Sequence, residues 1–136
     1  MKDLERAIEL LTGERTCVLV KDDTVYISEE KGIAPIMYYL NNGIDISGFS
    51  VADRIVGKAA ASLFICAGIK EAYGEVMSEK GLAKLEEYKI PASCGHLVEK
   101  IINRRGDDIC PMDKTVLDIE DPHEAYKALY EKTKSH

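Results

Sequence analysis

Residues 51–68 read VADRIVGKAAASLFICAG, and this stretch decides most of the fold. Residues 51–56 form a short, mostly apolar run that favours an extended strand, and Gly57 interrupts it. From Gly57 to Ala67 the residues are small or apolar on nearly every side of a helix, and Gly68 supplies the stop. Because a helix that is apolar all round must be buried, the stretch predicts a strand followed by a helix packed against a sheet.

The residues before this stretch predict a helix, a β-hairpin and a second helix. Residues 2–11 carry apolar positions at helical spacing, and residues 16–20 form a continuous apolar run that suits an interior strand. Residues 21–23 make a turn, after which residues 25–27 return as a second strand. Pro35 suits the first turn of a helix that runs to Leu40.

The residues after this stretch continue the alternation. Residues 69–77 read as a strand, and Ser78 caps a predicted helix that ends at Tyr88. Residues 89–92 are a short strand at best. An amphipathic helix is predicted after Gly95 from four apolar positions, Leu97, Val98, Ile101 and Ile102.

The last helix has the clearest start signal in the chain. Asp121 is the expected cap, Pro122 takes the first helical position, and Glu124 completes a capping box. A leading hairpin followed by alternating helices and strands predicts a three-layer α/β/α architecture with a mixed sheet. No linker or repeat is found, so residues 1–136 are expected to form a single domain.

Composition excludes several classes of function. The formal net charge is −6, and the only dense basic spot is Arg104–Arg105, so general nucleic-acid binding is not expected. No stretch is long and apolar enough for a membrane span, which places the expected location in the cytoplasm with no membrane partner. The four cysteines are then expected to be mostly free thiols. They are widely scattered and the only close soft pair is Cys94 and His96, so neither a zinc site nor another cofactor is predicted.

Three places are candidates for chemistry, and each has a plain structural alternative. Gly57 at a helix start, followed by Lys58, is a possible seat for a phosphate or carboxylate, although Gly57 can also serve only a tight turn and Lys58 can be solvated. Cys110 precedes Pro111 at a predicted helix start, where a thiolate is stabilised, although a buried, inert cysteine is the favoured alternative. Asp53 lies in an apolar segment and needs a partner, for which Lys58 is the candidate.

These candidates have supporting residues. Arg104 and Arg105 lie just upstream of Cys110 and can fold back towards the thiol, whereas neither His96 nor His123 has a fixed place as its base. Asp53 and Lys58 are either a structural ion pair or the polar floor of a pocket. The acidic run at residues 118–121 is interpreted as a solvated approach to the last helix.

The chain resembles an uncharacterised prokaryotic family catalogued as domain of unknown function 1893. The likeness rests on SVADRIVGKAAA at residues 50–61, CPMD at residues 110–113, the Asn103–Arg104 step and LDIEDP at residues 117–122. The family usually has Glu at position 113, where this chain has Asp and keeps the charge. The resemblance implies a fold like that of the cytidine-deaminase superfamily, and it brings no established activity.

The zinc motifs of that superfamily are missing from this chain. Zinc deaminases need His or Cys, then Ala and Glu, at the helix that here begins Lys58–Ala59–Ala60, and a later Pro-Cys-x-x-Cys. Cys110–Pro111 has the reverse order and no second cysteine. Zinc-dependent deamination is therefore excluded by sequence, and whether the chain is an enzyme at all stays open.

The leading hypothesis is a domain that binds a small anionic or nucleotide-like ligand. Its pocket would lie near Gly57, Lys58 and Cys110, with an anion held by Lys58 and by Arg104 or Arg105. Asp53 would orient a polar group, Asp113 would belong to the site, and Cys110 would be a wall or a nucleophile. Two other readings stay open: a non-catalytic regulatory module that forms homo-oligomers, through a sheet edge or the Tyr38–Tyr39 surface, and a metal-free thiol enzyme centred on Cys110.

Overall fold

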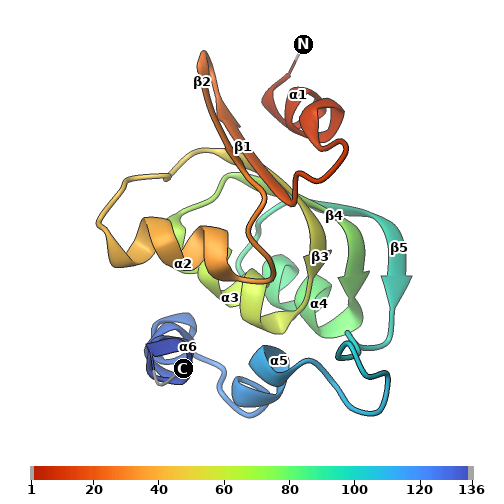
Figure 1. Cartoon of the computed structure of the whole chain (residues 1–136). Coiled ribbons are helices and arrows are strands. Elements are labelled where there is room, and N and C mark those ends of the chain that lie inside the picture. The colour runs from red at the N-terminus through yellow and green to blue at the C-terminus, as the bar shows by residue number, and fades with distance from the viewer. Residues whose placement is uncertain (1, 135–136) are drawn as a thin grey trace.

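The computed structural model describes residues 2–134 and contains a five-stranded mixed sheet with helices on both faces (Figure 1). The strand order is β2-β1-β3-β4-β5. β1 is antiparallel to both β2 and β3, whereas β3, β4 and β5 run parallel. The predicted α/β class with a mixed sheet is confirmed. The strands are β1 (Cys17–Lys21), β2 (Thr24–Ser28), β3 (Ser50–Val56), β4 (Glu71–Ser78) and β5 (Ala92–Val98).

The helices lie unevenly on the two faces of the sheet (Figure 1). One helix, α1, covers the first face, and the others gather on the second face or beyond it. No helix within residues 2–134 is both long and apolar enough to cross a lipid bilayer. The helices are α1 (Asp3–Leu10), α2 (Ala34–Asn41), α3 (Lys58–Ala67), α4 (Glu79–Glu87), α5 (Pro111–Thr115) and α6 (Pro122–Lys134).

Two apolar clusters hold these layers together. On the first face, Ala7 and the neighbouring Leu11 pack on Val18, Val20 and Ala52 of the sheet. On the second face, a larger cluster joins the opposite side of the sheet to α2, α3, α4 and α6. Alternation along β1 explains the division, because successive side chains of a strand point to opposite faces.

Helix α3 is buried because it has neighbours on all sides. It contacts β3, α2, α4, α5 and α6, which accounts for its apolar composition. Gly68 ends the helix in the left-handed conformation, at φ 75°, which residues with a Cβ rarely adopt. The strand and helix predicted from residues 51–68 are confirmed.

The predicted caps are confirmed with one difference. The Ser78 hydroxyl accepts a hydrogen bond from the Gly81 N–H at 3.0 Å, and Asp121 accepts one from the Glu124 N–H at 3.2 Å. The Glu124 carboxylate lies 3.4 Å from Lys127 instead of returning to Asp121, so α6 has a cap without the reciprocal half of a capping box.

The helix predicted after Gly95 is wrong. Residues 92–98 form the edge strand β5, and Ile102 lies in a loop that is closed by a bridge to Ile109. Leu97 and Ile102 are 52 % and 48 % exposed, so the apolar spacing does not mark a buried helix face. Gly95 fits the strand closely, because a Cβ there would lie 2.8 Å from the backbone oxygen of Glu75 on β4.

Candidate functional site: a cleft at the end of strand β3

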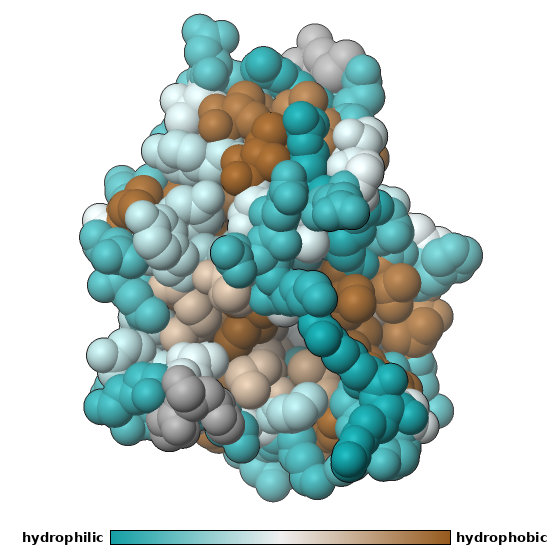
Figure 2. Space-filling model, viewed as in Figure 1, coloured by the Kyte–Doolittle hydropathy of each residue, from teal (hydrophilic) through white to brown (hydrophobic). Residues whose placement is uncertain are grey.

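A cleft of about 700 Å³ opens where β3 runs past the end of β1. Cys17, the first residue of β1, pairs with Asp53, and one further hydrogen bond joins the Arg54 N–H to the Thr16 oxygen. Beyond that point no strand within residues 2–134 pairs with β3 on this side. The space there is bounded by residues 31–33, residues 101–105 and the start of α5. Figure 2 shows apolar residues beside polar ones around a hollow near the middle of this view.

Asp53 lies at the inner end of the cleft. The residue is only 5 % exposed, yet among residues 2–134 no side chain forms a hydrogen bond or ion pair with its carboxylate. Burial raises the pKa of Asp53 to about 7, and the backbone N–H groups of Arg54 and Ile55 oppose this increase only in part. Because this value is near neutral, the carboxylate can exchange a proton under ordinary conditions.

Cys17 lies directly across the strand pair from Asp53 and is completely buried. Burial, and then the nearby charge of Asp53, raises the pKa of the Cys17 thiol well above its usual range. The thiol therefore stays protonated and neutral.

The outer wall of the cleft is a loop that carries two arginines. Arg104 and Arg105 line the cleft and are exposed to solvent. The turn that carries them is ordered by Asn103, whose side-chain oxygen accepts hydrogen bonds from the N–H groups of Gly106 and Asp107 at 2.8 and 3.2 Å. Their guanidinium groups can bind a carboxylate or a phosphate through paired hydrogen bonds.

The predicted anion seat at the start of α3 is filled by the protein itself. The Asp113 carboxylate accepts a hydrogen bond from the Ala59 N–H at 2.9 Å. A Cβ built on Gly57 would lie 2.0 Å from an oxygen of Asp113, so glycine is needed there to admit the carboxylate. Burial raises the pKa of Asp113, and the bond from Ala59 opposes that shift. Asp113 is thus the cap of α3, supplied from α5.

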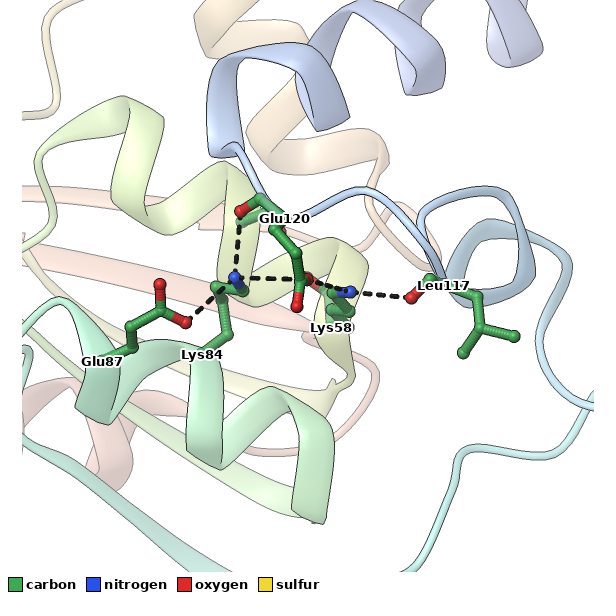
Figure 3. Close-up of polar contacts among 6 residues, drawn as sticks. Lys58, Lys84, Glu87, Leu117 and Glu120 are labelled. Carbon is green, nitrogen blue, oxygen red and sulfur yellow. Dashed lines mark hydrogen bonds and ion pairs between the residues drawn. The ribbon is translucent and has the colours of Figure 1, made fainter.

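Lys58 is not among the residues that line the cleft, and its side chain points towards Leu117 and Glu120 (Figure 3). It is 6 % exposed, and its ammonium group donates to the Leu117 oxygen at 2.9 Å and to Glu120 at 2.7 Å. The predicted pair with Asp53 is therefore wrong. Lys58 instead lines a smaller cavity of about 280 Å³, and Ile101 and Asp113 line both this cavity and the cleft.

A second buried lysine, which sequence reasoning missed, shares the same carboxylate. Lys84 is 4 % exposed and donates to the Glu120 backbone oxygen at 2.9 Å and to Glu87 at 3.1 Å (Figure 3). The Glu120 side chain is 76 % exposed, and its hydrogen bond with Lys58 and the charges of both lysines lower its pKa. The acidic run at residues 118–121 is thus more than a solvated approach to α6, because Glu120 forms ion pairs with Lys58 of α3 and Lys84 of α4.

Comparison with known proteins places the chain in a family. The family model TM1506, domain of unknown function (DUF1893), matches residues 6–133. The chain belongs to the DUF1893 family. A crystal structure of a DUF1893 family protein (TM1506) from Thermotoga maritima is similar, with 25 % sequence identity and a TM-score of 0.87 over 97 % of this chain and 91 % of that chain. None of the curated proteins compared with the chain matches it.

Membership of DUF1893 confirms the resemblance drawn from residues 50–61 and 110–113. The further likeness to the cytidine-deaminase superfamily stays a prediction.

Cys110 of this DUF1893 domain is half-buried and lines the cleft as the residue that precedes α5. All four cysteines are free thiols, as expected. His96 on β5 and His123 on α6 are not among the residues that line the cleft, so neither stands beside Cys110 as a base. Within residues 2–134, no three His, Cys, Asp or Glu side chains are grouped so as to hold a metal ion.

The structure therefore brings together most of the predicted site residues. Six of them line one cleft: Asp53, Gly57, Arg104, Arg105, Cys110 and Asp113. Of these, Gly57 and Asp113 are occupied with each other at the start of α3, and Lys58 lies outside. The remaining predicted residues that line the cleft are Asp53, Arg104, Arg105 and Cys110.

Proposed function

We propose that this DUF1893 domain binds a small anionic molecule in the cleft at the end of β3. The observation that carries the proposal is Asp53, a buried carboxylate that lines an open cleft and has no side-chain partner among the described residues, 2–134. A buried carboxylate is normally paired with a cationic side chain, because its charged form loses hydration when it is buried. A site that keeps such a group open to a cavity is typical of ligand recognition.

The remainder of the cleft supports the same function. Its walls are largely apolar, with Ile33, Ile55 and Met112 among the lining residues, and such walls bind a ligand by removing its apolar surface from water. Arg104 and Arg105 stand at the exposed side and would hold the negative charge of the ligand.

Lys58 and Gly57 have no direct part in this site. The Lys58 ammonium group already has two acceptors, and the space beside Gly57 contains Asp113. Oligomer formation and a thiol reaction at Cys110 stay predictions.

A thermal-shift screen with nucleotides, nucleosides and phosphorylated metabolites tests the proposal. A ligand at a hundred times its dissociation constant should stabilise the protein by about 2.7 kcal/mol. The stabilisation should fall in the double variant Arg104→Ala/Arg105→Ala, which removes the cations that hold the negative charge of the ligand, and it should change in Asp53→Asn, which removes the buried carboxyl. The matched control is Lys127→Ala/Lys134→Ala, which removes the same charge from α6, an element that does not line the cleft.

Two outcomes would overturn the proposal. One is a screen in which no compound stabilises the protein. The other is stabilisation that the cleft variants and the α6 control retain equally, because the compound would then bind elsewhere.

A further inference from the structure

When Asp53 is ionised, the inner end of the cleft carries a negative charge that no side chain within residues 2–134 balances. No cationic side chain within residues 2–134 forms an ion pair with Asp53. Arg54 is next in sequence, but its guanidinium group donates to two backbone oxygens and to Glu75 at 2.7 Å. Lys58, the other nearby cation in sequence, is bound to Glu120. Asp53 is therefore either neutralised by a proton or, when ionised, stabilised by a cationic group that a ligand brings into the cleft.

An ionised carboxylate only accepts hydrogen bonds, so its partner must be a donor. In a buried setting a cationic donor is the better partner, because its charge offsets the cost of keeping the carboxylate ionised. The chemistry of Asp53 thus favours a protonated amine, amidine or guanidine over a hydroxyl group.

The cleft combines apolar surface with charged side chains of both signs. Ile55, Ala59 and Met112 give apolar surface, which suits a hydrocarbon chain or a flat ring and not a polyol. Arg104 and Arg105 then present positive charge near solvent. A ligand that matches the whole cleft has opposite charges at its two ends.

We propose that the cleft of this domain takes a zwitterion, whose cationic nitrogen is bound by Asp53 and whose carboxylate or phosphate is bound by Arg104 and Arg105, with an apolar spacer between them; this rests on the proposed function of the cleft. The negative end is shared with the function proposed above. The cationic end is new, and it assigns Asp53 the role of selecting the ligand by charge.

A series of unbranched ω-amino acids of increasing length tests the inference. Each is compared with two analogues of the same length: the plain carboxylic acid, which lacks the nitrogen, and the N-acetyl derivative, which keeps an N–H but no charge. Binding is measured by calorimetry above pH 7, where Asp53 is ionised to a large extent. At least one amino acid should bind the wild-type protein about tenfold or more tightly than both analogues.

Two variants locate the two charges. Asp53→Asn should remove the preference for the amino acid over its N-acetyl derivative, since an amide carries no charge. Arg104→Ala/Arg105→Ala should weaken all three classes of compound. The preference for the amine over the acetamide should survive in that double variant wherever binding is still measurable.

The inference is overturned if no amino acid of the series binds, if the plain acid binds as well as the amino acid, or if Asp53→Asn keeps the preference. If the plain acid binds as well as the amino acid and its binding depends on Arg104 and Arg105, the proposed function of the cleft still holds. If no compound of the broader metabolite screen binds, both the proposed function and the zwitterion inference are overturned.

Discussion

Asp53 gives the clearest prediction at the scale of a single residue. Burial raises its pKa from 3.8 to about 7, so the folded protein holds a proton that the unfolded chain releases at lower pH. The free energy of unfolding should therefore fall as pH rises from about 4 to about 7, and then level off. Asp53→Asn removes this loss of stability. The free energy of unfolding of the variant should therefore be higher than that of the wild type by a few kcal/mol above neutral pH, and by much less at low pH.

Urea unfolding of both proteins at about pH 5 and about pH 8 measures the difference. Asp113, whose pKa is also raised, is common to both proteins and cancels. Asp45→Asn is the control, because hydrogen bonds from Ser47 lower the pKa of that exposed carboxyl. The effect of Asp45→Asn on the free energy of unfolding should therefore be the same at about pH 5 and at about pH 8. If the free energies of unfolding of Asp53→Asn and the wild type differed by the same amount at both pH values, the result would contradict the burial of an uncompensated charge at Asp53.

At the scale of elements, the joint between α5 and α3 depends on one carboxylate and one missing Cβ. Asp113→Ala should cost about 1 kcal/mol, since it removes the cap from the Ala59 N–H. Gly57→Ala should also destabilise the protein, because the new Cβ would overlap the Asp113 carboxylate. With Asp113→Ala already in place, Gly57→Ala should cost less, as the three nearest atoms all belong to that carboxylate.

Chemical unfolding of the wild type, the two single variants and the double variant gives the coupling energy of the pair. Additive costs would mean that Asp113 is not the group that requires glycine at position 57. The φ angle of Gly57 is −104°, which other residues also adopt, so backbone strain does not explain a loss there.

The elements that sequence could predict are those whose signals are local. The hairpin needs only two apolar runs and a turn, and Asp22 at its turn indeed has a positive φ of 53°. Helix α3 is apolar on every side, and α6 has its own cap. Strand β5 has no such signal: it depends on its parallel pairing with β4, more than a dozen residues away in sequence, and its apolar residues happen to fall at helical spacing.

The same division separates the parts of the candidate site. Asp53, Cys110 and the two arginines were singled out because each is unusual in its own segment, and they line one cleft. The partner of Lys58 could not be predicted, because Glu120 is 62 positions away and lies in a run of acidic residues that looks solvated. Lys84 has no local signal either, since a lysine on an amphipathic helix is normally exposed.

At the scale of the whole molecule, the large apolar cluster makes distant elements depend on one another. Cys17 on β1 and Leu129 on α6 belong to this cluster, and both are completely buried. In Figure 1 the hairpin and α6 lie at opposite ends of the view, with α3 between them. If the cluster unfolds as one unit, a cavity made at α6 must expose the thiol of Cys17 more often.

Labelling of the native protein with iodoacetamide, followed by mass spectrometry, measures this dependence. Leu129→Ala should cost about 2–5 kcal/mol, so Cys17 should react about 30-fold faster or more in that variant. Cys110 lines an open cleft and should react before Cys17 in the wild type, at a rate that Leu129→Ala leaves nearly unchanged. Lys127→Ala, an exposed change on the same helix, should leave both rates as they are. If Leu129→Ala left the labelling rate of Cys17 unchanged, α6 would open by itself, and the hairpin and α1 would form a separately stable unit.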